Sequence, residues 1–206
     1  LLASTNPAVV AYDPAFGYEI AHIKQDGLHR MFGTDDSLTD DQRNVIYYIT
    51  VYNEPMVQPA EPENVDREGI IKGMYLLEAS EGDGPRVQLL ASGVGVPWIR
   101  EAQELLRADW GVVADVWSVT SWNELRREAL EVDKANFLDP QAQPRVPYVT
   151  QRLQNTRGPV IAVSDSMRAV QDQIAQWGPG DFASVGADGC GFSDTRPAAR
   201  RFFHID

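Results

Sequence analysis

The sequence is poor in the residues that most often carry covalent or metal chemistry. It holds one cysteine, Cys190, and three histidines among 206 residues. A single cysteine excludes an internal disulfide, which fits a reducing compartment such as the cytoplasm. The chain also lacks an apolar run of the roughly 20 residues that a membrane-spanning helix needs, and it shows no signal-peptide pattern.

Positive charge is scarce as well. Lysine and arginine total 18 against 30 aspartates and glutamates, which gives a formal net charge of −12. Such a surface repels nucleic-acid backbones and anionic membranes, so neither is an expected partner. Hydrophobic residues nevertheless make up 43% of the chain, as in an ordinary globular protein with an apolar core.

The second half of the chain is organised around a strand–helix–strand–helix run with short connections. This order is typical of a parallel βαβ sheet, so an α/β fold with a mostly parallel sheet is predicted. Apolar and β-branched runs predict strands, and amphipathic stretches predict helices. The predicted strands are 87–92, 112–119, 159–163 and 182–185, and the predicted helices are 97–109, from 121 onward, 148–155, 166–177 with Ser166 as N-cap, and from 196 onward.

The first part of the chain reads as a smaller α/β segment. Strands are predicted over 8–11 and 45–52, and a helix with Gly33 as C-cap over 17–32. Residues 53–64 contain three prolines and three glutamates, which is typical of a linker, and residues 65–77 predict a short helix followed by a strand. The opening LLASTNPAVV has no initiator Met, so we expect a piece of a longer polypeptide.

One helix face gathers candidate metal ligands. His22, Asp26 and His29 lie within about 60° of one another at about 100° per residue, and imidazole and carboxylate groups can bind a divalent metal. The two histidines are separated by two helical turns, about 10.5 Å, which is far for one ion. A solvated helix face is therefore the favoured interpretation.

Gly93 and Gly95 follow a strand and precede a helix, as the glycines of a phosphate-binding turn do. The dinucleotide pattern requires a third glycine three residues later, where this chain has Trp98. A tight strand-to-helix turn explains the two glycines without a ligand, and this is the favoured interpretation.

Cys190 lies in the glycine-rich loop GADGCGFSD, where a thiol could approach a helix N-terminus. No histidine stands near it in sequence, so buried packing is the favoured role. Asp188, Ser193 and Asp194 are then turn and cap residues. The five tryptophans are expected mostly at core-facing positions, and they are Trp98, Trp110, Trp117, Trp122 and Trp177.

Several long segments together resemble one family, the homodimeric pyruvate dehydrogenase E1 component. They are YDPAFGYEIAHIKQDGLHRMFG, NVIYYITVYNEP, EGIIKGMYLLE, RVQLLASG, DVWSVTSWNELRREA, PRVPYV and GADGCGFSDTR. Subunits of this family have three α/β domains. The resemblance implies that residues 1–56 end the pyrimidine-binding middle domain, 57–69 form a linker, and 70–206 form a truncated transketolase-like C-terminal domain.

The resemblance also implies the chemistry of the full-length protein. In this family thiamine diphosphate, held with Mg²⁺, attacks and decarboxylates pyruvate, and the two-carbon unit then reductively acetylates the lipoyl group of dihydrolipoyl acetyltransferase. The family's activating glutamate, metal ligands and active-site histidines belong to segments upstream of Leu1. No catalytic, cofactor-binding or metal residue is therefore expected here, and His22, His29 and His204 receive no role.

Two departures from the family pattern are visible. Cys190 takes the place of a phenylalanine in the family's last loop, G-x-D-G-F-G-x-S-D, and the chain ends at Asp206, whereas the family continues. The main hypothesis is a scaffold and dimer interface that is inert by itself. The alternatives are a non-catalytic interaction domain and a related ketol-transferring, transketolase-like enzyme.

Overall fold

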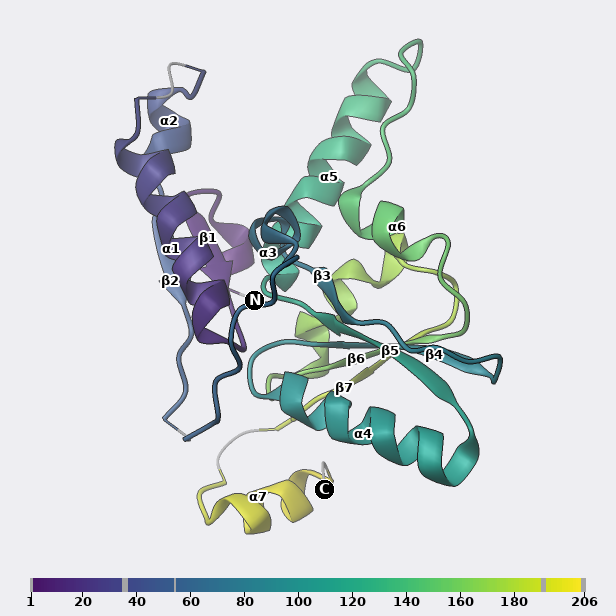
Figure 1. The fold of residues 1–206 in the computed structure, drawn as a ribbon. Coiled ribbons are helices and arrows are strands. Elements are labelled where there is room, and N and C mark those ends of the chain that lie inside the picture. Colours follow the sequence, from purple (N-terminus) through teal and green to yellow (C-terminus); the bar gives the residue numbers. More distant parts are fainter. Residues whose placement is uncertain (1, 35–36, 54, 190–191, 205–206) are drawn as a thin grey trace.

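The computed structural model describes residues 2–34, 37–53, 55–189 and 192–204. These residues form a two-stranded sheet near the N-terminus and a five-stranded sheet in the rest of the chain (Figure 1). In chain order the elements are η1 (Leu2–Thr5), β1 (Val9–Tyr12), α1 (Gly17–Phe32), α2 (Asp40–Arg43), β2 (Ile46–Ile49), α3 (Arg67–Lys72), β3 (Tyr75–Glu78), β4 (Arg86–Ala91), α4 (Gly95–Trp110), β5 (Val113–Ser118), α5 (Trp122–Leu138), α6 (Tyr148–Leu153), β6 (Val160–Val163), η2 (Arg168–Val170), η3 (Asp172–Trp177), β7 (Phe182–Val185) and α7 (Arg196–Phe203).

The elements η1 to β2 form what we call the N-terminal unit. Its strands β1 and β2 are parallel, with Val9 opposite Ile46, and α1 covers them as predicted (Figure 1). β2 is shorter than the predicted strand 45–52. The Thr50 N–H still donates to the Tyr12 carbonyl of β1, and the Thr50 and Tyr52 hydroxyls donate to Asp13. A two-stranded sheet is marginal by itself, so this unit depends on packing against the second sheet.

The five-stranded sheet has the order β3-β5-β4-β6-β7. Strands β5, β4, β6 and β7 are parallel, and β3 is antiparallel to β5, which confirms the predicted mostly parallel sheet. Leu89 and Leu90 alternate between the two faces, as strand geometry requires. Leu89 joins the apolar cluster on the side of α4 and the N-terminal unit, and Leu90 joins the cluster with α5 and α6 (Figure 1).

Strand order places a topological switch point between β4 and β6. The chain leaves β4 toward β5 on one side, whereas β6 leads to β7 on the other. In open α/β sheets, ligands characteristically bind at the carboxyl ends of the strands beside such a point. This position is therefore the first place to look for a site.

Residues 166–177 were predicted as one α-helix, and this prediction is wrong. The segment forms two short 3₁₀ helices, η2 and η3, and the residue that precedes η2 is Met167, not Ser166. Long-range contacts fix this path, since Gln171 donates to the Val185 carbonyl and the Trp177 indole donates to Asp133. Within the described residues, no helix has both the length and the apolar character needed to cross a membrane.

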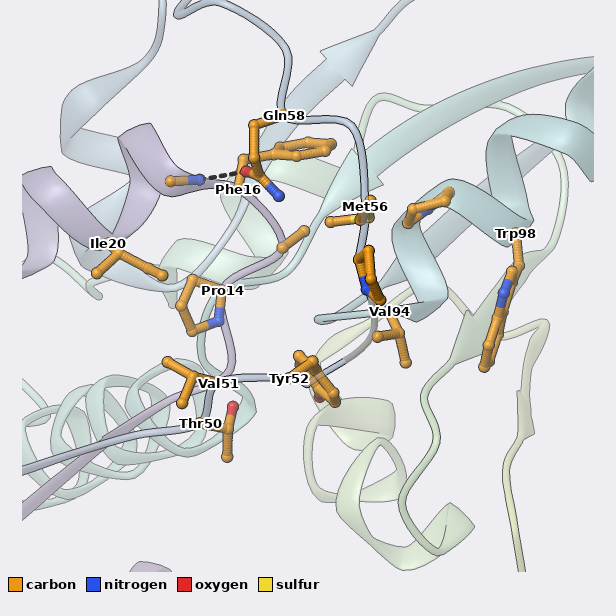
Figure 2. Close-up of a pocket in the computed structure, with 14 residues that line it drawn as sticks. Pro14, Phe16, Ile20, Thr50, Val51, Tyr52, Met56, Gln58, Val94 and Trp98 are labelled. Atoms are coloured by element: carbon orange, nitrogen blue, oxygen red, sulfur yellow. Dashed lines mark hydrogen bonds between the residues drawn. The ribbon is translucent and has the colours of Figure 1, made fainter. Parts of the chain in front are cut away.

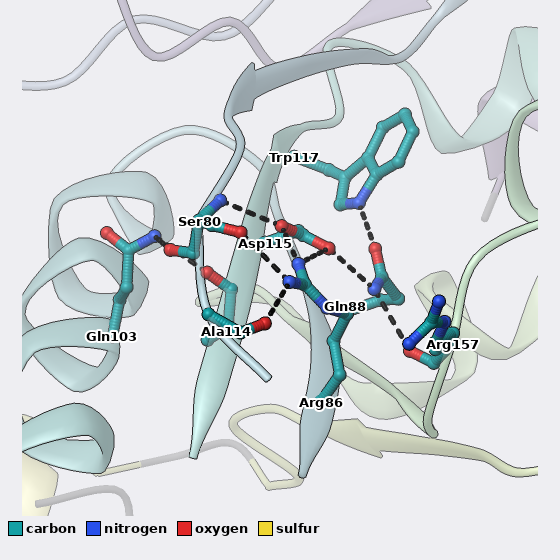
Figure 3. Close-up of polar contacts among 9 residues, drawn as sticks. Ser80, Arg86, Gln88, Gln103, Ala114, Asp115, Trp117 and Arg157 are labelled. Carbon is teal, nitrogen blue, oxygen red and sulfur yellow. Dashed lines mark hydrogen bonds and ion pairs between the residues drawn. The ribbon is translucent and has the colours of Figure 1, made fainter. Parts of the chain in front are cut away.

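The amino ends of β4 and β5 are joined by a closed polar network (Figure 3). Arg86 donates to both oxygens of Asp115, at 2.7 and 2.8 Å, and buried Gln88 donates to Asp115 and accepts from the Trp117 indole. Burial acts against the ionised form of Asp115, but hydrogen bonds from the Ser80 N–H, Arg86 and Gln88 prevail and lower its pKa. These polar groups satisfy one another within the sheet.

The two sheets meet at Glu19, a fully buried carboxyl on α1. Its Oε1 accepts from Ser118 Oγ at 2.6 Å and from Tyr75 Oη at 2.7 Å, both in the second sheet. Its Oε2 accepts from the Ala15 and Phe16 N–H groups at the start of α1. Burial raises the pKa of Glu19, and these four hydrogen bonds act against that rise.

We expect Glu19→Ala to lower the free energy of unfolding by about 3 kcal/mol or more, because it leaves buried donors without an acceptor and opens a cavity. Urea unfolding measures the change. The matched control is Glu63→Ala, since Glu63 is exposed in the linker and should change stability by less than about 0.5 kcal/mol. A loss for Glu19→Ala as small as the control's would contradict the joining role of Glu19.

Candidate functional site

Asp13 follows β1 directly and lies at the carboxyl end of β4. Its N–H donates to the Thr120 carbonyl at 2.7 Å, and its own carbonyl accepts from the Gly93 N–H at 3.0 Å. Its side-chain Oδ2 accepts from Ser92 Oγ at 2.7 Å. A carboxylate from the N-terminal unit is therefore bonded at the switch point of the neighbouring sheet.

The other oxygen of this carboxylate binds the segment after β2. Oδ1 of Asp13 accepts from Tyr52 Oη at 2.6 Å and from the Thr50 hydroxyl. Tyr52 Oη also lies 3.5 Å from Oδ1 of Asp165, just after β6. Burial and the Asp13 charge raise the pKa of Tyr52. Partial desolvation and the Asp13 charge raise the pKa of Asp165.

Two cavities flank Tyr52. The first, of about 340 Å³, is lined by the N-terminal unit, the segment after β2 and the start of α4, with Phe16, Met56 and Trp98 around it (Figure 2). Among the described residues no charged side chain lines it, and we call it the apolar cavity. The second, of about 330 Å³, has the carboxylates Asp13 and Asp165 in its lining, and we call it the polar cavity. We define these two cavities and the side chains between them as the junction site.

The glycine turn at the start of α4 belongs to this site. Gly93 has a φ of +50°, and a Cβ there would lie 2.3 Å from Tyr52 Oη and 2.8 Å from Asp13 Oδ1. The Gly95 N–H donates to the Ser92 carbonyl. Side chains of the protein itself thus occupy the space in front of the turn that a phosphate would need, which favours the tight-turn interpretation.

Two of the three candidate metal ligands on α1 have partners of their own, and the third is exposed. His22 Nε2 lies 3.0 Å from Glu61 Oε1 in the linker, Asp26 accepts a long hydrogen bond from Tyr47 Oη at 3.4 Å, and His29 is exposed. Nowhere in the described part of the chain do three or more His, Cys, Asp or Glu side chains gather as a metal would require. The solvated-face interpretation is favoured.

The loop after β7 holds the remaining candidates. Cys190 lies outside the described residues. Asp188 accepts from Arg168 Nε at 2.5 Å in an ion pair. The residue that precedes α7 is Thr195, so the prediction that Ser193 or Asp194 caps this helix is wrong, although Asp194 accepts from the Thr195 N–H.

The tryptophans are mostly buried, as predicted, with one clear exception. Trp117, Trp122 and Trp177 are at most 9% exposed, and Trp98 lines the apolar cavity under the Arg200 guanidinium. Trp110 is 77% exposed, because it ends α4 where the chain turns at Gly111. Sequence reasoning missed Asp13, Glu19, Tyr52 and Asp165, since no local pattern marks partners far apart in the chain.

Comparison with known protein families gives two matches along the chain. Residues 1–59 match the middle domain of the pyruvate dehydrogenase E1 component. Residues 73–206 match the transketolase-like TK C-terminal domain. The second match covers more than half of the chain.

The chain is 55% identical to the pyruvate dehydrogenase E1 component of Mycobacterium tuberculosis and spans 22% of that protein. It is 43% identical to that of Escherichia coli, with 98% of the chain aligned to 22% of the relative. Among solved structures, transketolase from Campylobacter jejuni has the same fold, with a TM-score of 0.62 and 18% identity over 99% of the chain and 25% of that structure. The chain therefore belongs to the transketolase-like family through its C-terminal domain, and its whole length is homologous to one part of pyruvate dehydrogenase E1 components.

Proposed function

We propose that this chain is part of an enzyme that decarboxylates pyruvate with thiamine diphosphate and passes the two-carbon unit to the lipoyl group of dihydrolipoyl acetyltransferase. The observation that supports this is 55% identity, over the whole chain, to a protein named pyruvate dehydrogenase E1 component. The enzyme acts as a homodimer in the cytoplasm within a multienzyme complex. The chain spans about a fifth of the length of such relatives.

The proposed division of the chain is 1–56 as the end of the middle domain, 57–69 as linker and 70–206 as C-terminal domain. The separate sheets and the matched ranges 1–59 and 73–206 support it. The linker is tied to α1, since the Gly17 N–H donates to Gln58 Oε1 at 2.8 Å. This contact holds the linker along the apolar cavity.

The proposed role of the chain is scaffold and dimer interface, without catalytic, cofactor-binding or metal residues of its own. Thiamine diphosphate and Mg²⁺ require cations or metal ligands around the phosphates. The described residues that line the apolar cavity include no charged side chain, and Asp13 and Asp165 in the polar cavity would repel a diphosphate. The residues present do not fit this group, so both are bound chiefly by residues outside the chain.

Two alternatives remain as proposals of lower rank. A ketol-transferring enzyme is suggested by the transketolase fold, but the similarity to transketolase is only 18% in sequence. A non-catalytic interaction domain is suggested by exposed apolar side chains on the N-terminal unit, such as Phe32 at 75% and Ile46 at 63%. The substrate and the state of association separate these alternatives from the main proposal.

The longer polypeptide that contains this chain should decarboxylate pyruvate when supplied with thiamine diphosphate and Mg²⁺. With lipoylated acetyltransferase domain as acceptor, acetyl-lipoamide should form, which mass spectrometry detects. Sugar phosphates serve as the control substrates. Ketol transfer between sugar phosphates, without acetyl-lipoamide, would favour the transketolase alternative and overturn the main proposal.

A purified chain of residues 1–206 should neither bind thiamine diphosphate nor release carbon dioxide from pyruvate. The reason is that the described lining of the apolar cavity carries no charge and that Asp13 and Asp165 in the polar cavity repel a diphosphate. Isothermal titration calorimetry with Mg²⁺ present measures binding, and the longer polypeptide is the positive control. Micromolar affinity of the isolated chain would contradict a purely supporting role.

A supporting role for the junction carboxyls also predicts a pH dependence. The pKa of Asp165 is raised in the folded state. At pH values above the unfolded pKa and up to the folded pKa, the folded state therefore binds more protons than the unfolded state. The free energy of unfolding falls as the pH rises through this range. Asp165→Asn should therefore match the parent's Tm below about pH 4 and exceed it at neutral pH.

The matched control for this variant is Asp181→Asn. Asp181 is exposed, and its side chain makes no hydrogen bond or ion pair within the part of the chain that the structure describes. Thermal unfolding of all three proteins from about pH 4 to pH 8 gives the comparison. A lower Tm of Asp165→Asn at neutral pH would show that the ionised Asp165 stabilises the fold, contrary to this prediction.

A further inference from the structure

A third cavity lies between α5 and the N-terminal unit, and it shares one lining residue, Asn123, with the polar cavity of the junction site. Its volume is about 470 Å³, and its walls come from η1, α1, α2 and α5. Of the described residues that line it, four are basic, Arg30, Arg126, Arg127 and Lys134, and one is acidic, Glu131. We call it the basic cavity. Such a gathering of positive charge contrasts with the net charge of −12 on the chain.

The basic side chains reach the cavity because of the period of α5. Trp122, Leu125, Ala129 and Val132 face the core of the second sheet and are buried. Arg127 and Lys134 are seven residues apart, so they share the side of the helix opposite this buried face, and Arg126 lies at the edge between the two sides. Arg30 approaches from α1, nearly 100 residues earlier in the sequence. Figure 1 shows α5 beside the N-terminal unit, which contains α1 and therefore Arg30.

Part of this charge has no acidic partner. Arg127 pairs with Glu124 at 3.3 Å and donates to the Val9 carbonyl. Arg30 donates through Nε to the Gln42 carbonyl at 2.7 Å, and its charge also acts on Glu124. Within the described residues, neither Arg126 nor Lys134 makes a hydrogen bond or ion pair. Positive charge is thus in excess among the described side chains around this cavity.

We propose that the basic cavity binds a small multivalent anion that carries phosphate or carboxylate groups. Guanidinium groups bind both kinds of oxyanion in bidentate fashion, and the Gln42 and Asn123 side chains in the wall add hydrogen-bonding groups. The volume is in the usual range for a small-molecule site. The bound anion joins α1 to α5 and so couples the N-terminal unit to the second sheet. The inference does not depend on the proposed function.

Titration calorimetry of the longer polypeptide at low ionic strength tests this site, with inorganic pyrophosphate in one arm and citrate in the other. We expect saturable binding of at least one probe, and the preferred probe identifies phosphate or carboxylate as the recognised group. The double variant Arg126→Gln/Lys134→Gln should weaken that binding at least tenfold. Both side chains lie at the helix surface, so the variant should fold, which circular dichroism verifies.

The matched control is Lys24→Gln/Arg107→Gln, which removes the same charge from exposed positions on α1 and α4 outside the cavity. It should leave the affinity within about twofold, since neither side chain lines the cavity. Absence of saturable binding of both probes to the parent would overturn the proposal. So would equal weakening in both double variants, or binding that persists unchanged when Arg126 and Lys134 are replaced.

Discussion

Two carboxylates of the N-terminal unit, Glu19 and Asp13, determine how the two sheets are placed relative to each other. Glu19 accepts from Ser118 and Tyr75 of the second sheet, and Asp13 accepts from Ser92 at the end of β4. A buried carboxylate without such donors would cost several kcal/mol. Only the observed placement provides these donors, so both cavities of the junction site follow from it.

This placement also puts a side chain of the N-terminal unit into the crevice at the switch point of the second sheet. In open α/β sheets the crevice at the switch point is where ligands bind, but here Asp13 occupies it and bonds to the Gly93 turn. At the opposite strand ends, Arg86 and Asp115 satisfy each other. The second sheet thus supports the N-terminal unit, which agrees with a chain that belongs to the transketolase-like family through its C-terminal domain.

The basic cavity has a different physical origin from the junction site. Core packing explains Glu19 and Asp13, but it does not explain several like charges around a cavity, because they repel one another. A surface optimised for stability alone would alternate Arg126, Arg127 and Lys134 with acids on the facing elements. The excess positive charge is therefore best understood as a feature that serves binding.

Local patterns by themselves determined the parallel strands, the helix over 17–32 and the family resemblance. The reason is that the spacing of apolar residues and the long motifs involve residues that are close together in the sequence. Tertiary structure alone decided that 168–177 forms 3₁₀ turns, that Glu19 joins the sheets, and that Arg30 meets α5. The Glu19–Ser118 bond spans 99 residues. No local pattern encodes such a pair, since its energy exists only once the two sheets have packed.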